Sequence, residues 1–364
     1  MSVRDLVRPD LRDFAGYQSA RKARVTGDVW LNANESAWES DGDGAARLNR
    51  YPQPQPDTLR AGLARLYGAR PEQLLVTRGS DEAIDLLVRA LCPPGQGAIV
   101  VTPPTFGMYA VCARLHGVQL VEAPLQARDE RFHCDVEQVE EAVRRSDARL
   151  VFLCSPGNPT GQALPIEDVR RLAAAVASRA VVVVDEAYQE FASGPSAVAL
   201  LAESRNVAVL RTLSKAHALA AARIGTVMAD PALVEVLQRC QAPYPLAAPA
   251  TDAALAALAP GVLEKTNARV LEVRGARDAM ANALSRLPGV RQVHPSDANF
   301  LLVRFADAEA AWRVLIEAGV VVRDMRSVAG LEDALRITVG TARENRRVMD
   351  ALVAPCNGMR AVRA

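Results

Sequence analysis

The sequence predicts an α/β protein with a large, mostly parallel sheet and a smaller α+β domain. Between residues 74 and 228, β-rich apolar runs alternate with helical segments. Such alternation is typical of crossover connections in a parallel sheet that is covered on both faces. A length of 364 residues suits one large and one small domain. Seven strands are expected in the large sheet, at 74–77, 98–102, 118–122, 149–153, 180–184, 207–211 and 224–228.

Two further features refine the expected topology. Residues 57–67 carry leucines on one helical face, which predicts a helix with Asp57 as its cap and Gly68 as its stop. The gap between the last two predicted strands is too short for a crossover helix, so one antiparallel strand is expected there.

The C-terminal part of the sequence predicts the second domain. A proline-rich bridge at 243–249 precedes a long predicted helix near 260–286. Strands are expected near 299–304, 320–323 and 334–338, with helices at 307–318 and 342–354. The chain is thereby divided into an N-terminal arm at 1–45, a large domain at 46–250, a small domain at 251–356 and a flexible tail at 357–364.

The composition argues against several classes of function. The chain has 43 basic and 42 acidic side chains, which does not suit a nucleic-acid or polyanion surface. No apolar run reaches membrane-spanning length, and the first ten residues lack an apolar signal core. Six cysteines without a C-x-x-C pair indicate reduced thiols in a cytoplasmic protein. Four scattered histidines form no ligand pair, so no metal is expected.

The lysine at position 215 has the neighbours that an aldehyde cofactor with a phosphate group requires. Thr212 and Ser214 precede Lys215 closely, and Arg223 follows it by eight residues. The amine can form a Schiff base with the aldehyde, while the hydroxyls and the guanidinium hold the phosphate. Taken alone, a Ser-Lys pair is more often part of a solvated loop.

A carboxylate ends the predicted strand at 180–184. Asp185 follows four consecutive valines, and an acid at the carboxyl end of a buried parallel strand lies where open α/β sheets bind ligands. A protonated pyridine nitrogen would be a suitable cationic partner, and Tyr188 could donate its hydroxyl to a ring oxygen of the same cofactor. A helix cap or a magnesium-binding acid is the alternative interpretation.

Two polar turns follow other predicted strands. Asn158 lies in a turn with two prolines and two glycines, and its amide can donate to a ring oxygen. Gly79, Ser80 and Asp81 begin an amphipathic helix, whose free backbone N–H groups suit a phosphate. The first turn could also be a plain strand-to-helix connection, and Ser80 or Asp81 could simply cap the helix.

In this order, the four motifs resemble the fold-type I pyridoxal-phosphate aminotransferases, over about residues 15 to 355. Shorter stretches resemble the histidinol-phosphate aminotransferase family in particular. They include Tyr17-Gln-Ser-Ala-Arg21, Leu31-Asn-Ala-Asn34-Glu35, Arg50-Tyr51-Pro, Pro103-Pro-Thr-Phe106-Gly-Met-Tyr109, Val322-Arg323-Asp324 and Leu335-Arg336-Ile-Thr.

The resemblance implies pyridoxal 5′-phosphate as cofactor, held by a Schiff base to Lys215. The implied catalytic residues are Lys215, Asp185 and Tyr188. The implied cofactor site comprises Gly79, Ser80, Asp81, Phe106, Asn158, Asp185, Tyr188, Thr212, Ser214, Lys215, Arg223 and, from a second subunit, Tyr51. Relatives usually carry tyrosine at position 106, so Phe106 keeps the stacking on the cofactor and loses the hydroxyl. His217 replaces a usual aromatic residue and is interpreted as packing.

The resemblance also implies the substrate site and the partners. Substrate contacts are expected from Tyr17, Asn34, Tyr109, Asn158, Arg323 and Arg336. Arg336 resembles the arginine that grips the α-carboxylate of glutamate; an ion pair at a strand edge is the alternative. The N-terminal arm is expected on the small domain, with Tyr17 in the substrate site. Because Tyr51 is expected to reach the other subunit's cofactor, the implied active unit is a homodimer that binds small molecules but neither nucleic acid nor membrane.

The function implied by the resemblance is transamination between histidinol phosphate and 2-oxoglutarate in histidine biosynthesis. An aromatic amino-acid aminotransferase and a threonine-phosphate decarboxylase, which would use the same cofactor, remain alternatives. A non-catalytic regulator would need a nucleic-acid-binding segment, for which the chain has no spare domain or basic cluster.

Overall fold

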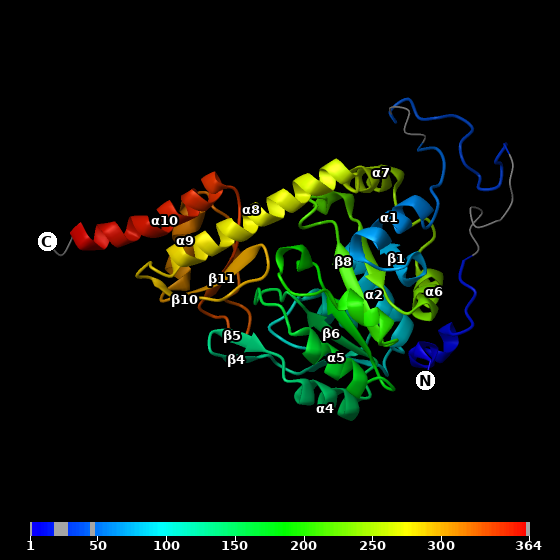
Figure 1. The fold of residues 1–364 in the computed structure, drawn as a ribbon, viewed down its shortest axis with the longest axis horizontal. Helices are drawn as coiled ribbons and strands as arrows, with labels where there is room; N and C mark the ends of the chain where they lie inside the picture. The colour runs from blue at the N-terminus through cyan, green and yellow to red at the C-terminus, as the bar shows by residue number, and fades with distance from the viewer. Residues whose placement is uncertain (1, 18–27, 44–47, 362–364) are drawn as a thin grey trace.

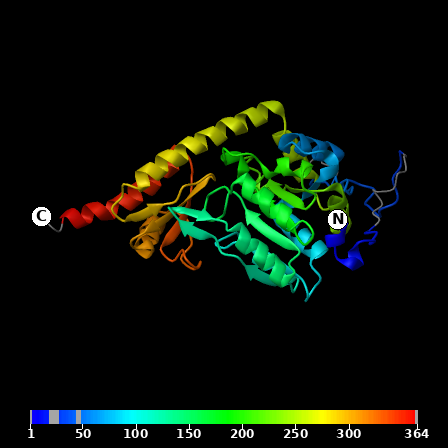
Figure 2. The ribbon, with the colours of Figure 1, turned by 60° about the horizontal axis from the view of Figure 1, so that its bottom comes forward.

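The computed structural model describes residues 2–17, 28–43 and 48–361, with side chains described up to residue 353. Figures 1 and 2 show a large α/β body next to the N-terminus and a smaller body towards the C-terminus. The long helix α8 (Pro260–Leu284) runs along both. Within the described residues, no helix is long and apolar enough to cross a membrane.

The large sheet has seven strands in the order β1-β9-β8-β7-β6-β2-β3. All seven predicted strands are present, and the prediction of one reversed strand is confirmed: β9 pairs antiparallel with both β8 and β1, while the other pairs are parallel. The strands are β1 (Leu74–Thr77), β2 (Ala98–Val101), β3 (Gln119–Glu122), β6 (Leu150–Cys154), β7 (Val181–Asp185), β8 (Val207–Thr212) and β9 (Gly225–Met228).

Two hydrophobic cores enclose this sheet, because consecutive residues of a strand point to opposite faces. Val182 and Val184 of β7 enter one core, and Val181 and Val183 enter the other. The first core receives α1 (Asp57–Tyr67), α4 (Val136–Ser146), α5 (Ile166–Ala175) and α7 (Ala248–Ala257). The second receives α2 (Gly79–Leu91), α3 (Met108–Leu115) and α6 (Pro231–Cys240). This double coverage explains why the valine run of β7 shows no polar alternation.

The boundaries of α1 correct one prediction. The cap position is Pro56, and Asp57 is the first helical residue without a capping hydrogen bond; its carboxylate pairs with Arg60 instead. Proline suits this position because it has no N–H to satisfy. Gly68 ends the helix in the left-handed conformation, with φ of 74°, as predicted.

The smaller body contains a four-stranded antiparallel sheet in the order β10-β11-β13-β12. Its elements are β10 (Val290–Val293), β11 (Phe300–Phe305), α9 (Ala308–Glu317), β12 (Arg323–Asp324), β13 (Ala334–Thr338) and α10 (Ala342–Ala361). Helix α10 therefore includes most of the segment 357–364 that was expected to be a flexible tail. Strand β10 and the hairpin of β4 (Gln126–Arg128) and β5 (Arg131–His133) were not predicted from the sequence. Short 3-10 turns occur at Val3–Leu6, Pro9–Leu11, Pro71–Gln73, Gln189–Phe191, Ala197–Ala202 and Ala220–Ala222.

The start of the N-terminal arm packs on the large sheet and not on the small domain, which corrects the expectation from family resemblance. Val3, Leu6 and Val7 are buried in the core that contains α2 and α6. Their spacing gives the first turn an apolar face, and the backbone N–H of Arg8 donates to the carbonyl of Ala90 at 3.0 Å. The part of the arm at 18–27 lies outside the described residues.

Candidate active site

A cavity of about 570 Å³ lies at the carboxyl ends of the parallel strands, between the large sheet and the small one. This is the position at which open α/β sheets bind their ligands. Most predicted site residues line it, namely Ser80, Asp81, Phe106, Asn158, Asp185, Tyr188, Thr212, Ser214, Lys215, Arg223, Arg323 and Arg336. Residues separated by 256 positions in the chain, from Ser80 to Arg336, are thus brought into one site.

Lys215 presents its amine to the cavity from the loop that follows β8. The Nζ atom lies 5.6 Å from the centre of the Tyr188 ring. Desolvation by the surrounding protein and the positive charge of Arg336 lower the pKa of Lys215. The loop is braced locally, because Thr212 Oγ1 donates to Ser214 Oγ at 2.9 Å and accepts from the Ser214 N–H at 3.1 Å. A lysine with a lowered pKa is more readily the neutral amine that attacks an aldehyde.

Asp185 ends β7 and is 2% exposed. Tyr109 donates its hydroxyl to one carboxylate oxygen at 2.8 Å, and the Ala187 N–H donates to the other at 3.2 Å. Burial raises the pKa of Asp185 to about 6, against the two hydrogen bonds that lower it. No ion pair to Asp185 occurs within the described part of the chain, so a cation from a ligand would be stabilised here.

A second part of the cavity suits a phosphate group. Helix α2 begins at Gly79 without a side-chain cap. The alternative interpretation, in which Ser80 or Asp81 caps the helix, is therefore wrong. Its first N–H groups are therefore available to an anion. Arg223 lies beside this turn and pairs with Asp81 at 3.1 Å. Gly79 has φ of 73°, and a Cβ there would lie 2.6 Å from Arg223 Nη2, so this turn requires glycine.

Two arginines of the small sheet face the lysine across the cavity. Arg323 of β12 pairs in register with Arg336 of β13. Arg336 hydrogen-bonds the Asn158 side chain, and its guanidinium lies 5.2 Å from the centre of the Phe300 ring. Its buried Nε atom has no partner among the described residues. A pair of guanidinium groups with free donors suits an anionic group on a substrate.

Several predicted residues do not line the cavity. Tyr109 is fully buried behind it, where it holds Asp185 and stacks on Phe152 at 4.7 Å. Tyr51 is 49% exposed and stacks on Tyr244 at 4.3 Å, while Tyr17 is 61% exposed. Asn34 lies in the same N-terminal part of the chain, outside the lining. Gly79 contributes through the shape of its turn rather than by a side chain.

His217 is buried outside the cavity, beside a network of buried charges. Arg211 lies 3.2 Å from Glu186 and 2.7 Å from Glu190, and it covers the ring of Tyr67 at 4.5 Å. His217 lies 3.8 Å from Glu190. The network joins the residue after Asp185 to the strand that leads to Lys215, so it fixes these two strand ends relative to each other.

Sequence reasoning missed some lining residues. Thr105, Cys154, Met325 and Val328 contribute to the wall, and the Thr105 hydroxyl has no partner among the described residues. Cys154 directly follows the predicted strand at 149–153 and ends the observed strand β6, so its position before Asn158 was a usable indication. Met325 and Val328 lie in the loop between β12 and β13, whose path the sequence pattern does not specify.

Comparison with known proteins agrees with this geometry. The sequence family described as aminotransferase class I and II matches residues 22–352. The chain belongs to this family.

Named relatives of this aminotransferase are close in sequence. It is 58% identical over 351 residues to the histidinol-phosphate aminotransferase of Xanthomonas axonopodis pv. citri, which covers 96% of this chain and 97% of that protein. It is 57% identical to the histidinol-phosphate aminotransferase of Stenotrophomonas maltophilia, with 96% of each chain covered. The crystal structure of the histidinol-phosphate aminotransferase of Sinorhizobium meliloti in complex with pyridoxal-5′-phosphate has a TM-score of 0.77 and 28% identity, over 85% of this chain and 83% of that one.

The residues of the cavity fit pyridoxal phosphate. The buried carboxylate of Asp185 lacks a cation and can receive a protonated ring nitrogen. The free N–H groups of α2 and the guanidinium of Arg223 can hold the phosphate, and Lys215 lies where it can reach the aldehyde. Phe106 lines the same cavity and can cover the ring face.

Proposed function

We propose that this aminotransferase transfers an amino group between histidinol phosphate and 2-oxoglutarate in histidine biosynthesis, with pyridoxal 5′-phosphate as its cofactor. The identity of more than half of all residues to named histidinol-phosphate aminotransferases supports the reaction. The observation that carries the chemistry is the cavity in which Lys215 stands between the unpaired carboxylate of Asp185 and the two arginines of the small sheet.

Lys215 has two tasks in this proposal. It attaches the cofactor covalently and, once released by the incoming amine, moves a proton from the substrate Cα. When bound, pyridoxal phosphate supplies the electrophilic carbon for the amine and a ring that withdraws electrons from that Cα. A positioned base contributes about 10²–10⁴-fold to such a proton transfer. The lowered pKa of Lys215 keeps more of the amine neutral and able to accept the proton.

Asp185, Tyr188, Asn158 and Phe106 orient the cofactor ring. Asp185 keeps the ring nitrogen protonated, and Tyr109 holds the carboxylate in place through its 2.8 Å hydrogen bond. Tyr188 and Asn158 are within the same wall and have hydroxyl and amide groups for a ring oxygen. Thr212, Ser214, Ser80 and Arg223 bind the phosphate.

Arg323 and Arg336 select the substrates. Glutamate carries an α-carboxylate and histidinol phosphate carries a phosphate ester, so one site must accept either anion. A guanidinium has a planar fork of donors that matches both groups, which lysine would not provide equally well. The unused Nε of Arg336 leaves room for an additional bond to the bound anion.

The active unit in this proposal is a homodimer in the cytoplasm. Tyr51 is half-exposed at the stack with Tyr244. In this proposal its hydroxyl reaches the cofactor phosphate of the second subunit. Tyr17 and Asn34 belong to the substrate site only once the arm is placed in that assembly. Large exposed apolar side chains concentrate in the same part of the chain, among them Val29, Leu31 and Trp38 at 77–85% exposure. The five cysteines that the structure describes are free, which suits a reducing compartment.

The deciding experiment is a single half-reaction. Cofactor-loaded protein is mixed with histidinol phosphate alone, and the visible spectrum is followed. Conversion of the yellow aldehyde form to the amine form, reversed by 2-oxoglutarate, is expected. The Lys215→Ala variant serves as control and should show neither the yellow form nor turnover. Conversion by phenylalanine but not by histidinol phosphate would assign the protein to aromatic transamination. Release of CO₂ from threonine phosphate, in a separate assay, would assign it to decarboxylation.

A further inference from the structure

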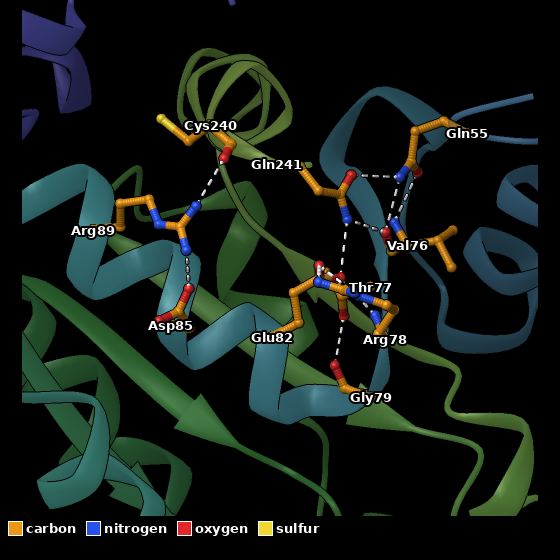
Figure 3. Close-up of polar contacts among 10 residues, drawn as sticks. All are labelled: Gln55, Val76, Thr77, Arg78, Gly79, Glu82, Asp85, Arg89, Cys240 and Gln241. Atoms are coloured by element: carbon orange, nitrogen blue, oxygen red, sulfur yellow. Dashed lines mark hydrogen bonds and ion pairs between the residues drawn. The ribbon is translucent and has the colours of Figure 1, made fainter. Parts of the chain in front are cut away.

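Three polar side chains outside the cavity hold the turn between β1 and α2. Gln55 lies in the loop before α1, Glu82 in the first turn of α2 and Gln241 directly after α6 (Figure 3). Gln55 and Gln241 are buried, at 9% and 8% exposure, although glutamine is mostly an exposed residue. We refer to Gln55, Glu82 and Gln241 as the polar clasp.

Gln55 completes the edge of the large sheet. Among the strands that the structure describes, β1 pairs only with β9, so the backbone groups on its outer side need other partners. Gln55 Nε2 donates to the Val76 carbonyl at 2.8 Å, and the Val76 N–H donates to Gln55 Oε1 at 2.9 Å. The side-chain amide thus replaces the peptide group of a neighbouring strand, one residue before the end of β1.

Gln241 extends this arrangement to α2. Its Nε2 donates to the Val76 carbonyl and to Glu82 Oε2, both at 3.1 Å, and its Oε1 accepts from Gln55 Nε2 at 3.0 Å. Glu82 Oε2 in turn accepts from the Arg78 N–H at 2.7 Å, and Oε1 accepts from Arg78 Nε at 2.9 Å. The last residues of β1 and the residue before Gly79 are therefore fixed by one connected set of hydrogen bonds.

The turn that is held in this way forms the wall for the cofactor phosphate. Gly225 packs against its other side so closely that an added Cβ would lie 2.5 Å from the Ser80 nitrogen. We infer that the polar clasp positions the phosphate-binding N–H groups of α2, so that Gln55, Glu82 and Gln241 are positioning residues for cofactor binding. The inference rests on the proposed function, because the phosphate belongs to the cofactor assigned there.

The test compares a ligand that has the phosphate with one that lacks it. Gln241→Glu keeps the size of the side chain but places a carboxylate against Glu82 and the Val76 carbonyl, both acceptors. Absorbance titration of the apoprotein should show about tenfold weaker binding of pyridoxal phosphate, equivalent to about 1.4 kcal/mol. Binding of pyridoxal should change less than about twofold. Gln55→Glu, which also loses donors to Val76 and Gln241, should behave alike.

Arg89→Ala is the matched control. Arg89 connects α2 to the end of α6, the elements that Glu82 and Gln241 also connect. Its guanidinium donates to Asp85 at 2.7 Å and to the Cys240 carbonyl at 3.3 Å, and it makes no hydrogen bond to residues 76–82 (Figure 3). Both affinities should stay at wild-type values in this variant. Hydrogen exchange of the apoprotein gives a reading without ligand: the Val76 and Arg78 amides should exchange about tenfold faster in Gln241→Glu and unchanged in Arg89→Ala.

The outcomes separate the two proposals. An equal loss of affinity for pyridoxal and pyridoxal phosphate would reveal general loosening and overturn the positioning role. Wild-type affinity for pyridoxal phosphate in both glutamate variants would overturn it as well. A wild-type protein that binds neither compound would instead overturn the cofactor assignment under the proposed function.

Discussion

At the scale of single residues, Asp185 shows how a ligand can be anticipated from the free protein. A buried carboxylate without a paired cation is unfavourable, since burial disfavours its charged form. The chain retains it at the end of β7, with two hydrogen bonds that only partly compensate. In the proposed function, the protonated ring of the cofactor supplies the missing cation. The charge of Asp185 should therefore destabilise the free protein and stabilise the protein with bound cofactor.

We predict that Asp185→Asn makes the apoprotein more stable at neutral pH and the loaded protein less stable. The folded pKa of about 6 lies above the ordinary 3.8, so folding takes up a proton. The neutral carboxyl of Asp185 is favoured in the folded protein. The resulting contribution to stability is complete below pH 3.8 and is lost as the pH rises through about 6. The gain from asparagine should thus grow between these values and reach about 2–3 kcal/mol at pH 7. Urea unfolding at several pH values measures it.

Asparagine fits this position, because its Oδ1 can accept from Ala187 while its amide donates to the Tyr109 hydroxyl. A pH-independent difference in the free energy of unfolding would contradict the unpaired carboxylate. Equal stability of the two loaded proteins would contradict the pyridinium partner.

The position of a site residue in the cavity could be predicted from the sequence where its side chain follows a buried strand. Asp185 and Lys215 come after apolar runs, and the edge of a parallel sheet brings such residues together. Met325 and Val328 could not be found in this way, since the path of their loop depends on packing against Phe132 and Leu302. Tyr51 and Tyr17 lie outside the cavity of one chain, and their assignment stays a prediction until the assembly is measured.

At the scale of elements, the reversed strand β9 sets how closely the sheet approaches α2. Gly225 begins this strand, and a Cβ there would lie 2.4 Å from the Gly79 carbonyl carbon. Backbone cannot move aside as the end of a flexible side chain can. The lack of a side chain at Gly225 therefore allows the loop of Lys215 and Arg223 to end directly against the phosphate turn.

We predict that Gly225→Ala lowers the free energy of unfolding by about 1–3 kcal/mol, because the strand must shift away from α2. The matched control is Gly275→Ala in the exposed middle of α8, where no atom lies within 4 Å of the added Cβ. That change should stabilise by about 0.5–1 kcal/mol, since alanine favours a helix interior. Thermal unfolding midpoints that move in the same direction for both variants would contradict the close approach.

The strands that could be predicted from the sequence are more deeply buried than those that could not. The seven strands of the large sheet were predicted because most are continuous apolar runs, buried throughout. Strands β4, β5 and β10 have two to four residues each on exposed or half-exposed surface and few apolar side chains. The turn of the β4–β5 hairpin uses Asp129 and Glu130 at positive φ, without the glycine that would have indicated it.

At the scale of the whole molecule, the N-terminal part of the chain presents apolar side chains that one chain does not bury. Trp38 is 81% exposed and Leu31 is 85% exposed, and Tyr51 lies in the same part of the chain. Several large exposed apolar side chains in one segment suit an interface between subunits. The proposed sharing of the active site between subunits makes a prediction that stability measurements alone would not test.

We predict that two inactive variants restore each other. Lys215→Ala lacks the attaching amine, and Tyr51→Ala lacks the residue proposed to serve the opposite site. In a heterodimer of the two, one site has both residues intact, so about half the wild-type activity should return. Co-expression with two affinity tags allows the heterodimer to be purified and assayed. If the heterodimer had only the summed activity of its two homodimers, Tyr51 would act within its own subunit.

The long helix α8 runs along both bodies of the molecule and connects them mechanically. Its 25 residues span about 37 Å, with α7 near one end and the small sheet and α10 near the other. Val270 packs in one cluster with Tyr188 and Phe300, about 15 Å from the start of the helix and about 21 Å from its end. A rotation of α8 by about 5° around Val270 would displace the C-terminal end of the helix by about 2 Å. Such a rotation would move the small sheet relative to Lys215, while the ring contact between Tyr188 and Phe300 would stay close to the axis.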